Sequence, residues 1–357
     1  MCDFGEERSS RSIMVSRASK TTTRASMLLL NAVLLAVGIG GGPLVMRLYY
    51  IHGGKRIWLQ AWLETAGFPI MIFPLAAAYF HRRATHPPPA KLFFMSFPLL
   101  VASVLIGILA GSADYLYAYG VKHIPVSTSS LVLATQLAFT AGFAFLLVKQ
   151  RFTAYSINAV VLLTMGAAVL AMHSSSDRPV NVTNGEYYMG FFMTLASAAM
   201  FAAMLPLLEL TYKKSKLRIH YALVMEIQSV LSLSATLFCT VGMLINKDFQ
   251  AMRREAKEYE LGEGMYFVVL VCSALVWQCF YLGAAGVINY GSSLLSGIII
   301  AAALPVTEIL AVIFYHEKFQ QEKGVSLALS LWGFFSYFYG EYKQSTKINK
   351  AQTTELP

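Results

Sequence analysis

Apolar residues form long runs along this chain, and short polar stretches separate the runs. Each run is about 19 to 25 residues long, and a helix needs about 20 apolar residues to cross a hydrocarbon core about 30 Å thick. The pattern therefore predicts an all-α, polytopic membrane protein of ten transmembrane helices. We place the spans at residues 27–49, 57–80, 97–119, 126–148, 154–172, 187–210, 221–245, 265–287, 292–315 and 324–342.

Composition agrees with this pattern. Of the 357 residues, 56% are hydrophobic and 13% are charged, about half the ~25% charged share of an ordinary soluble domain. Ten spans with short loops leave no room for a separate soluble domain. The four cysteines have neither paired nor metal-like spacing, so we interpret them as free thiols: Cys2, Cys239, Cys272 and Cys279.

The formal net charge of +9 raises the question of nucleic-acid binding. The basic residues stand at the ends of apolar runs, where they orient a membrane protein, so no nucleic-acid partner is expected. A cytoplasmic N-terminus puts 17 Lys and Arg residues inside and 11 outside. Because cytoplasmic loops carry the excess of basic residues, the sequence predicts that both termini are cytoplasmic.

Two halves of the chain resemble each other. Residues 115–121 match residues 281–287, Ser129-Ser130-Leu131 matches Ser292-Ser293-Leu294, and residues 149–152 match residues 316–319. The period is five helices, so the two copies must lie in the membrane with opposite orientation. Inverted repeats are typical of secondary transporters, whose substrate site lies between the repeats.

This repeat sets the expected domain organisation. A polar, basic N-terminal segment and a polar C-terminal segment flank the two repeats, and the N-terminal segment is expected to be disordered. The divisions are a disordered cytoplasmic tail at 1–26, the first five-helix repeat at 27–172, an outer loop at 173–186, the second five-helix repeat at 187–342 and a cytoplasmic tail at 343–357.

Several short motifs carry a family resemblance that runs from about residue 27 to 343. They are Gly41-Gly42-Pro43-Leu44, Gly53-Gly54-Lys55-Arg56-Ile57-Trp58, Thr65-Ala66-Gly67-Phe68-Pro69, Tyr117-Ala118-Tyr119-Gly120, Pro125-Val126-Ser127-Thr128-Ser129-Ser130-Leu131, Gln136-Leu137-Ala138-Phe139 and Leu331-Trp332-Gly333-Phe334. In these the chain resembles the plant purine permeases of the drug/metabolite transporter superfamily. The resemblance implies a proton-coupled importer of adenine, cytokinins and related N-heterocycles, including plant alkaloids, in the plant plasma membrane.

One position departs from the family pattern. Where the third span of the family usually reads Asp-Asn, this chain has Ala113-Asp114, so the carboxylate is moved by one residue and an amide is lost. A neutral base needs matched donors and acceptors, which an amide supplies. A carboxylate favours a protonated amine instead, with Tyr115 and Tyr117 as cation–π faces. Purine-type bases and cationic alkaloids therefore both stay open as substrates.

Few acidic residues lie within the spans, and each is costly there, by at least ~2.5 kcal/mol at the centre of the membrane. Glu64, Asp114 and Glu308 fall in the outer halves of spans two, three and nine, which suggests one acidic cavity open to the outside. Burial disfavours the charged form of a carboxyl group, so these three are the candidates for proton coupling. Gly107, Gly111 and Asp114 form one stripe, and a face of small residues should pack Asp114 against a neighbouring helix.

A planar heterocycle needs stacking surfaces and edge-on hydrogen bonds in a dry site. Polar and aromatic residues within the spans are the candidates, although any single one is more often a core residue than a ligand contact. The substrate-binding candidates are Asn31, Gln60, Glu64, Asp114, Tyr115, Tyr117, Gln136, Trp277, Gln278 and Tyr281.

An enzyme and a channel are the competing classes. All seven histidines fall in loops or at span borders, so no catalytic metal, cofactor or catalytic residue is expected. No Gly-Lys-Ser/Thr phosphate loop is present, which argues against ATP as the energy source. The inverted repeat argues against a channel. The expected partners are a small heterocycle, protons and the lipid bilayer, and a monomer is compatible with the sequence.

Two features near the membrane borders complete the picture. Phe249, Met252, Ala256 and Tyr259 recur at helical spacing among charged residues, which predicts a short interfacial helix. Glu209 stands four residues before Lys213, the spacing of an ion pair on one helix face.

Overall fold

A computed structural model describes residues 3–85, 94–124, 129, 132–133, 135–150, 152–172, 183–215, 220–315 and 321–354. Every element in these ranges is a helix. In chain order they are α1 (Asp3–Ile51), α2 (Ile57–Ala66), the 3₁₀ helix η1 (Phe68–Met71), α3 (Ile72–Thr85), α4 (Phe97–His123), α6 (Gln136–Val148), α7 (Ala154–Met172), α8 (Asn184–Lys214), α9 (Tyr221–Ile245), α10 (Asp248–Glu258), α11 (Glu263–Tyr290), α12 (Ser293–Tyr315) and α13 (Gln321–Thr354).

Six helical segments of the described residues are long and apolar enough to cross a membrane. They are Thr22–Ile51, Ile57–Phe80, Phe97–His123, Asn184–Lys214, Tyr221–Ile245 and Glu263–Tyr290. Shorter apolar helices cover Gln136–Val148, Ala154–Gly166 and Ser293–Leu304. The all-helical membrane class is therefore confirmed, whereas ten spans and two inverted repeats stay predictions.

Both ends of the chain differ from the expected tails. The helix α1 already begins at Asp3, and α13 continues to Thr354, so the structure gives helix instead of disorder for residues 3–26 and carries its last described helix well past residue 342. Residues 6–37 contain neither glycine nor proline, so no residue there interrupts the helix that the first apolar run starts. The expected outer loop at 173–186 lies mostly outside the described residues.

The second predicted span is not one continuous helix. It breaks after Ala66 into α2, the 3₁₀ turn η1 and α3. Pro69 explains the break, because proline lacks an N–H group and its ring clashes with the carbonyl group of residue i−4, here Thr65. The helix α2, which carries Gln60 and Glu64, is therefore a short half-helix of ten residues.

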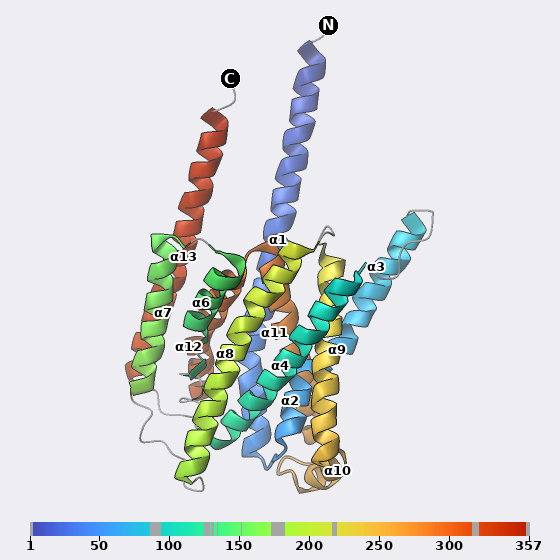
Figure 1. Ribbon diagram of the computed structural model, residues 1–357, viewed down its shortest axis with the longest axis vertical. Helices are drawn as coiled ribbons and strands as arrows, with labels where there is room; N and C mark the ends of the chain where they lie inside the picture. The colour runs from blue at the N-terminus through green and yellow to red at the C-terminus, as the bar shows by residue number, and fades with distance from the viewer. Residues whose placement is uncertain are drawn as a thin grey trace.

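The helices form one bundle, and the two termini lie at the same end of it (Figure 1). The helix α10 lies at the opposite end, which we call the α10 end (Figure 1). Helices α1 and α11 pack side by side, and α4 packs against both α8 and α9. The helix α2 contacts α4, α9 and α11, so the residues of α2 face the centre of this group.

Glycines allow the closest of these approaches. A side chain at Gly38 of α1 would collide with the backbone of Phe280 in α11, and one at Gly107 of α4 would collide with the carbonyl oxygen of Leu231 in α9. A methyl group added at Gly111 would lie only 3.0 Å from the carbonyl oxygen of Ala235 in α9. The small-residue stripe of α4 thus packs on α9, as the sequence predicts, and Asp114 is fully buried.

Candidate functional site

Two buried carboxyl groups lie at the centre of the bundle. Glu64 of α2 and Asp114 of α4 are both 0% exposed, and their carboxyl groups face each other and interact electrostatically. The hydroxyl group of Tyr281 in α11 donates a hydrogen bond of 2.6 Å to Oδ1 of Asp114. Apart from the contact between the two carboxyl groups, no described residue donates a hydrogen bond to either oxygen of Glu64 or to Oδ2 of Asp114. The pair therefore has acceptor oxygens that no other described side chain satisfies.

Amide and indole groups without partners surround the acid pair. Gln60 lies one helical turn before Glu64, and neither its Oε1 nor its Nε2 has a hydrogen-bond partner in the described part of the chain. Oε1 of Gln278 and Nε1 of Trp277 are also buried without a partner there. We call Gln60, Glu64, Asp114, Trp277, Gln278 and Tyr281 the central cluster. Buried polar groups are normally paired, so this set has donors and acceptors to offer a ligand.

Contacts between helices hold the central cluster together. Gly67, at the end of α2, packs on Ala274 and Gln278 of α11, where a side chain would not fit. The rings of Tyr117 and Trp277 meet edge to face, with 6.1 Å between their centroids. Both rings are almost fully buried. They provide an aromatic wall beside the polar groups.

The other candidates lie apart from this cluster. Asn31 accepts a hydrogen bond of 3.1 Å from Tyr221 and donates one to the carbonyl oxygen of Met27. Tyr115 stacks on Trp58, with 3.9 Å between the ring centroids. Gln136 is buried on α6, which packs on α7, α8 and α12. Glu308 falls in α12, and its side chain is outside the described residues.

Two residues that the sequence analysis did not select adjoin the acid pair. Tyr50 interacts electrostatically with Glu64, and its hydroxyl group lies 3.5 Å from the carbonyl oxygen of Ala118. Cys239 is fully buried and interacts with both acids. Tyrosine at a span border and a lone cysteine are common in membrane helices, so nothing in their spacing marks either one.

A second buried polar group lies at the α10 end. Glu255 of α10 accepts hydrogen bonds from the hydroxyl groups of Tyr49 and Tyr266, the latter at 3.2 Å. Arg56, at the start of α2, lies 3.4 Å from Oε2 of Glu255 and 3.4 Å from Oδ1 of Asp248. We call Arg56, Asp248 and Glu255 the ionic cluster. It joins the α1–α2 connection to α10.

This geometry corrects the prediction for α10. The helix is present, but it packs on protein, because Asp248, Glu255, Ala256 and Tyr259 are buried while Phe249 is 42% exposed. The buried face thus carries two acids as well as apolar side chains. Helical spacing alone does not reveal these buried acids, because a charged residue on a short surface helix is usually solvated.

Asp248 gives a pH-dependent contribution to stability. Burial raises the pKa of its carboxyl group, whereas the hydrogen bond from Asn246 and the charge of Arg56 lower it, and Glu255 and Tyr50 are its other electrostatic neighbours. With a raised pKa, the contribution is fully present below the unfolded-state pKa of about 3.9 and is lost as the pH rises through the folded-state pKa.

We therefore expect Asp248→Asn to remove this contribution. Thermal unfolding of the purified wild type and variant, from about pH 4 to neutral pH, should show that the wild type gains stability relative to the variant as the pH falls. A difference between the two proteins that is constant over this range would contradict the assignment.

Near the C-terminal end of α8, the predicted ion pair of Glu209 and Lys213 is confirmed, with 2.7 Å between Oε1 of Glu209 and Nζ of Lys213. Oε2 of Glu209 also accepts a hydrogen bond of 2.7 Å from the backbone N–H group of Ser293, at the start of α12. Glu209 is therefore a buried helix cap as well as an ion-pair partner.

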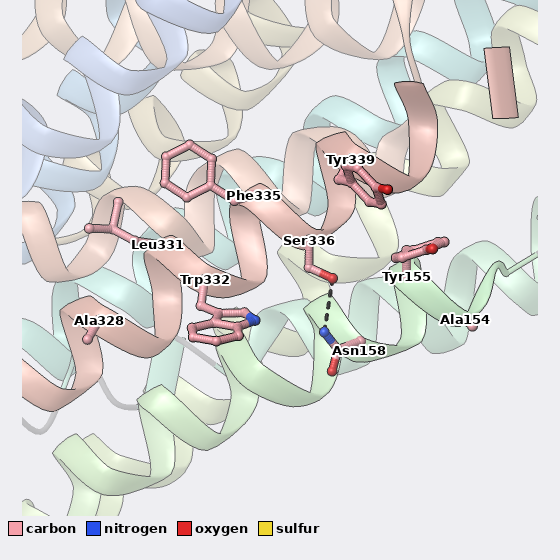
Figure 2. Close-up of a pocket in the computed structure, with 9 residues that line it drawn as sticks. All are labelled: Ala154, Tyr155, Asn158, Ala328, Leu331, Trp332, Phe335, Ser336 and Tyr339. Atoms are coloured by element: carbon pink, nitrogen blue, oxygen red, sulfur yellow. Dashed lines mark hydrogen bonds between the residues drawn. The ribbon is translucent and has the colours of Figure 1, made fainter. Parts of the chain in front are cut away.

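A cavity of about 920 Å³ lies between α7 and α13 (Figure 2). None of the residues that line it belongs to the central cluster. Nδ2 of Asn158 donates a hydrogen bond of 2.9 Å to Oγ of Ser336 at its wall. Trp332 and Phe335 are 70% and 67% exposed. Exposed aromatic side chains on apolar helices are typical of a surface in contact with lipid.

Comparison with known proteins places the chain among membrane transporters. A family model described as purine nucleobase transmembrane transport matches residues 26–347. Purine permease 3 of Arabidopsis thaliana is 53% identical over 332 residues, which cover 92% of this chain and 95% of the relative. Purine permease 2 of the same plant is 49% identical, with 92% and 96% coverage, and purine permease 21 is 38% identical, with 87% and 80%. One protein crystal structure superimposes with a TM-score of 0.60 at 16% identity, covering 88% of this chain and 96% of the other, which shows similarity of fold alone.

The apolar helices and these matches define an integral membrane transporter, and not an enzyme. More particularly, the chain belongs to the purine permease family. The resemblance on which the sequence analysis relied is thereby confirmed.

Proposed function

We propose that this protein imports purine-type N-heterocycles, adenine and cytokinins among them, by proton-coupled alternating access. Its two inverted five-helix repeats would expose the central cluster to either side of the plasma membrane in turn, with both termini in the cytoplasm. The observation that supports this best is the central cluster itself, where an acid pair is accompanied by the Gln60 amide, Oε1 of Gln278 and Nε1 of Trp277, all buried and without a partner among the described residues.

The polar groups match the chemistry of a purine. A primary amide presents a donor and an acceptor side by side, the arrangement that pairs with N6 and N7 of adenine. Gln60 of α2 is such an amide, and neither of its polar atoms has a partner in the described residues. Gln278 of α11 offers its unpaired Oε1, whereas its Nε2 donates to Sδ of Met71 at 3.5 Å, and the indole N–H group of Trp277 is a further donor. The neighbouring ring of Tyr117 offers an apolar surface to a planar heterocycle.

The acid pair suits proton coupling. Two carboxyl groups in contact away from water hold one negative charge at lower cost than two, so a shared proton is favoured. Binding and release of that proton, together with substrate, would couple uptake to the proton gradient. Glu308 is a further candidate for this role.

A second candidate substrate class is a cationic alkaloid, and the position of Asp114 is the observation that favours it. A protonated amine would pair with the carboxylate, near the rings of Tyr117 and Trp277. Saturable uptake with counterflow would distinguish either transporter from a channel.

The two substrate classes predict different effects of Asp114→Asn. In cells that express the wild type, labelled adenine uptake should be inhibited by zeatin and by a tertiary-amine alkaloid. The same two inhibitors are then tested on cells that express Asp114→Asn. If the amine pairs with the carboxylate, Asp114→Asn should weaken amine uptake by about tenfold more than adenine uptake, since loss of a charged hydrogen bond costs about 1.5–3 kcal/mol. Equal losses for the two substrates would rule out recognition of the amine by charge.

A further inference from the structure

The ionic cluster lies at the α10 end, and α2 connects it to the central cluster. Arg56, Gln60 and Glu64 follow one another at intervals of four residues on α2, so Arg56 is two helical turns, about 12 Å, from Glu64. All polar residues of the central cluster are at most 4% exposed. Along this row the side chains pass from 34% exposed at Arg56 to fully buried at Gln60 and Glu64, so Arg56 is the residue of the row that solvent reaches from the α10 end.

Charged and polar contacts hold Arg56 at this position. Asp248 is 0% exposed and Glu255 is 6% exposed, and Arg56 is the cation that lies within 4 Å of both among the described residues. Glu255 also accepts a hydrogen bond of 3.3 Å from the backbone N–H group of Lys55. Loss of one partner from a buried set of charges is costly, because it leaves the other charge without compensation.

Neighbouring backbone contacts hold the same two segments together. The N–H group of Glu260 donates a hydrogen bond of 3.3 Å to the carbonyl oxygen of His52. Nδ1 of His52 lies 3.1 Å from Oε2 of Glu260, which is 67% exposed. The hydroxyl group of Tyr259 bonds to the carbonyl oxygen of Leu48 at 3.2 Å. The connection between α1 and α2 is thus fixed to the end of α10 along its length.

Two adjacent tyrosines connect the ionic cluster to the central cluster. Tyr49 binds Glu255, and the next residue, Tyr50, interacts electrostatically with Glu64. A change at the acid pair and a change at Arg56 can therefore influence each other through one short segment of α1.

We infer that Arg56, Asp248 and Glu255 form the gate at the α10 end, and that the gate must open for substrate to reach the central cluster from that side. This inference rests on the proposed alternating access. It assigns a transport role to three residues outside the central cluster. Arg56 is the residue on which the gate depends most, because it contacts both acids.

Cysteine labelling tests the gate without any need for transport. Gln60→Cys, in a background without the four native cysteines, places a thiol one turn inside Arg56. In lipid nanodiscs, adding Arg56→Gln or Glu255→Gln should raise its rate of reaction with a charged thiosulfonate by about tenfold, because a loss of ~1.4 kcal/mol from the closed state shifts the population tenfold. Glu258→Gln is the matched control, since it removes an exposed acid of α10 outside the ionic cluster, and it should change the rate less than about twofold.

An unchanged rate in both gate variants would overturn the inference, and so would an equal increase in Glu258→Gln. Melting temperatures identify any variant that fails to fold. Should Arg56→Gln be one, Glu255→Gln alone decides the labelling experiment.

A disulfide provides the converse test. The backbone contact between residues 52 and 260 suits the ~4.4–6.8 Å Cα separation that a disulfide requires. Oxidation of His52→Cys/Glu260→Cys should lower labelled adenine uptake by about tenfold or more, and reduction should restore it. Oxidation should leave labelled adenine uptake by the two single variants, His52→Cys and Glu260→Cys, unchanged. Full uptake by the cross-linked protein would exclude the gate, whereas absence of uptake even before oxidation would concern the proposed substrate and leave the labelling result to stand.

Discussion

Glu64→Gln and Asp114→Asn are each expected to abolish most proton-driven uptake of adenine. Each variant replaces one half of the acid pair by an amide, so the shared proton site is lost while the size of the side chain is kept. We expect wild-type uptake to rise as the external pH falls and to collapse with a protonophore. The variants should show a nearly flat pH dependence and at least about a tenfold loss at acidic pH, comparable to the loss of one proton-transfer group in other proteins.

Two further variants make this experiment decisive. Glu263→Gln, which changes an exposed acid at the start of α11, is the control and should retain the wild-type pH dependence. Glu308→Gln tests the third candidate under the same conditions. Full pH dependence in both Glu64→Gln and Asp114→Asn would show that the acid pair is not the proton site.

Gly38→Ala is expected to destabilise the protein strongly, although it adds a single methyl group. The methyl group would collide with the backbone of Phe280 in α11, and backbone atoms cannot move aside as a flexible side chain can. Forcing extra atoms into a close-packed contact costs about 1–3 kcal/mol or more. The result should be a melting temperature several degrees lower and a reduced yield of folded protein.

Gly40→Ala is the matched control, because nothing lies within 4 Å of a methyl group at this position on the same helix. It should be neutral or slightly stabilising, since alanine favours a helix over glycine by about 1 kcal/mol. Equal melting temperatures for the two variants would mean that α1 and α11 do not pack through Gly38.

Much of the fold follows from the sequence because span length and apolarity are local properties. Most described helices overlap the expected runs, although α1 and α13 extend beyond theirs, and Pro69 explains the break after Ala66 in the second span. The residues of the central cluster could be predicted from the sequence for a similar reason. An acid or amide such as Glu64, Gln60 or Asp114 is conspicuous in an apolar helix.

The contacts between helices across the bundle could not be predicted from the sequence. Glu255 and Tyr49 are 206 residues apart in the chain, and no spacing rule connects them. Helix rotation has the same effect within a single element: Tyr115 and Asp114 are neighbours in sequence, yet Tyr115 stacks on Trp58 while Asp114 faces Tyr281. Sequence periodicity indicates which residues are buried more readily than it indicates which partners they meet.

The break in the second span has a consequence for the sign of charge at the central cluster. Glu64 lies in the last turn of α2, and the carbonyl end of a helix carries about half a negative elementary charge. In a continuous span this end would lie at the membrane surface, but here it lies beside the acid pair. The negative end of the α2 dipole and the carboxyl groups therefore both repel anions. Purines that have lost a proton and become anions should be excluded, while neutral and protonated heterocycles are admitted.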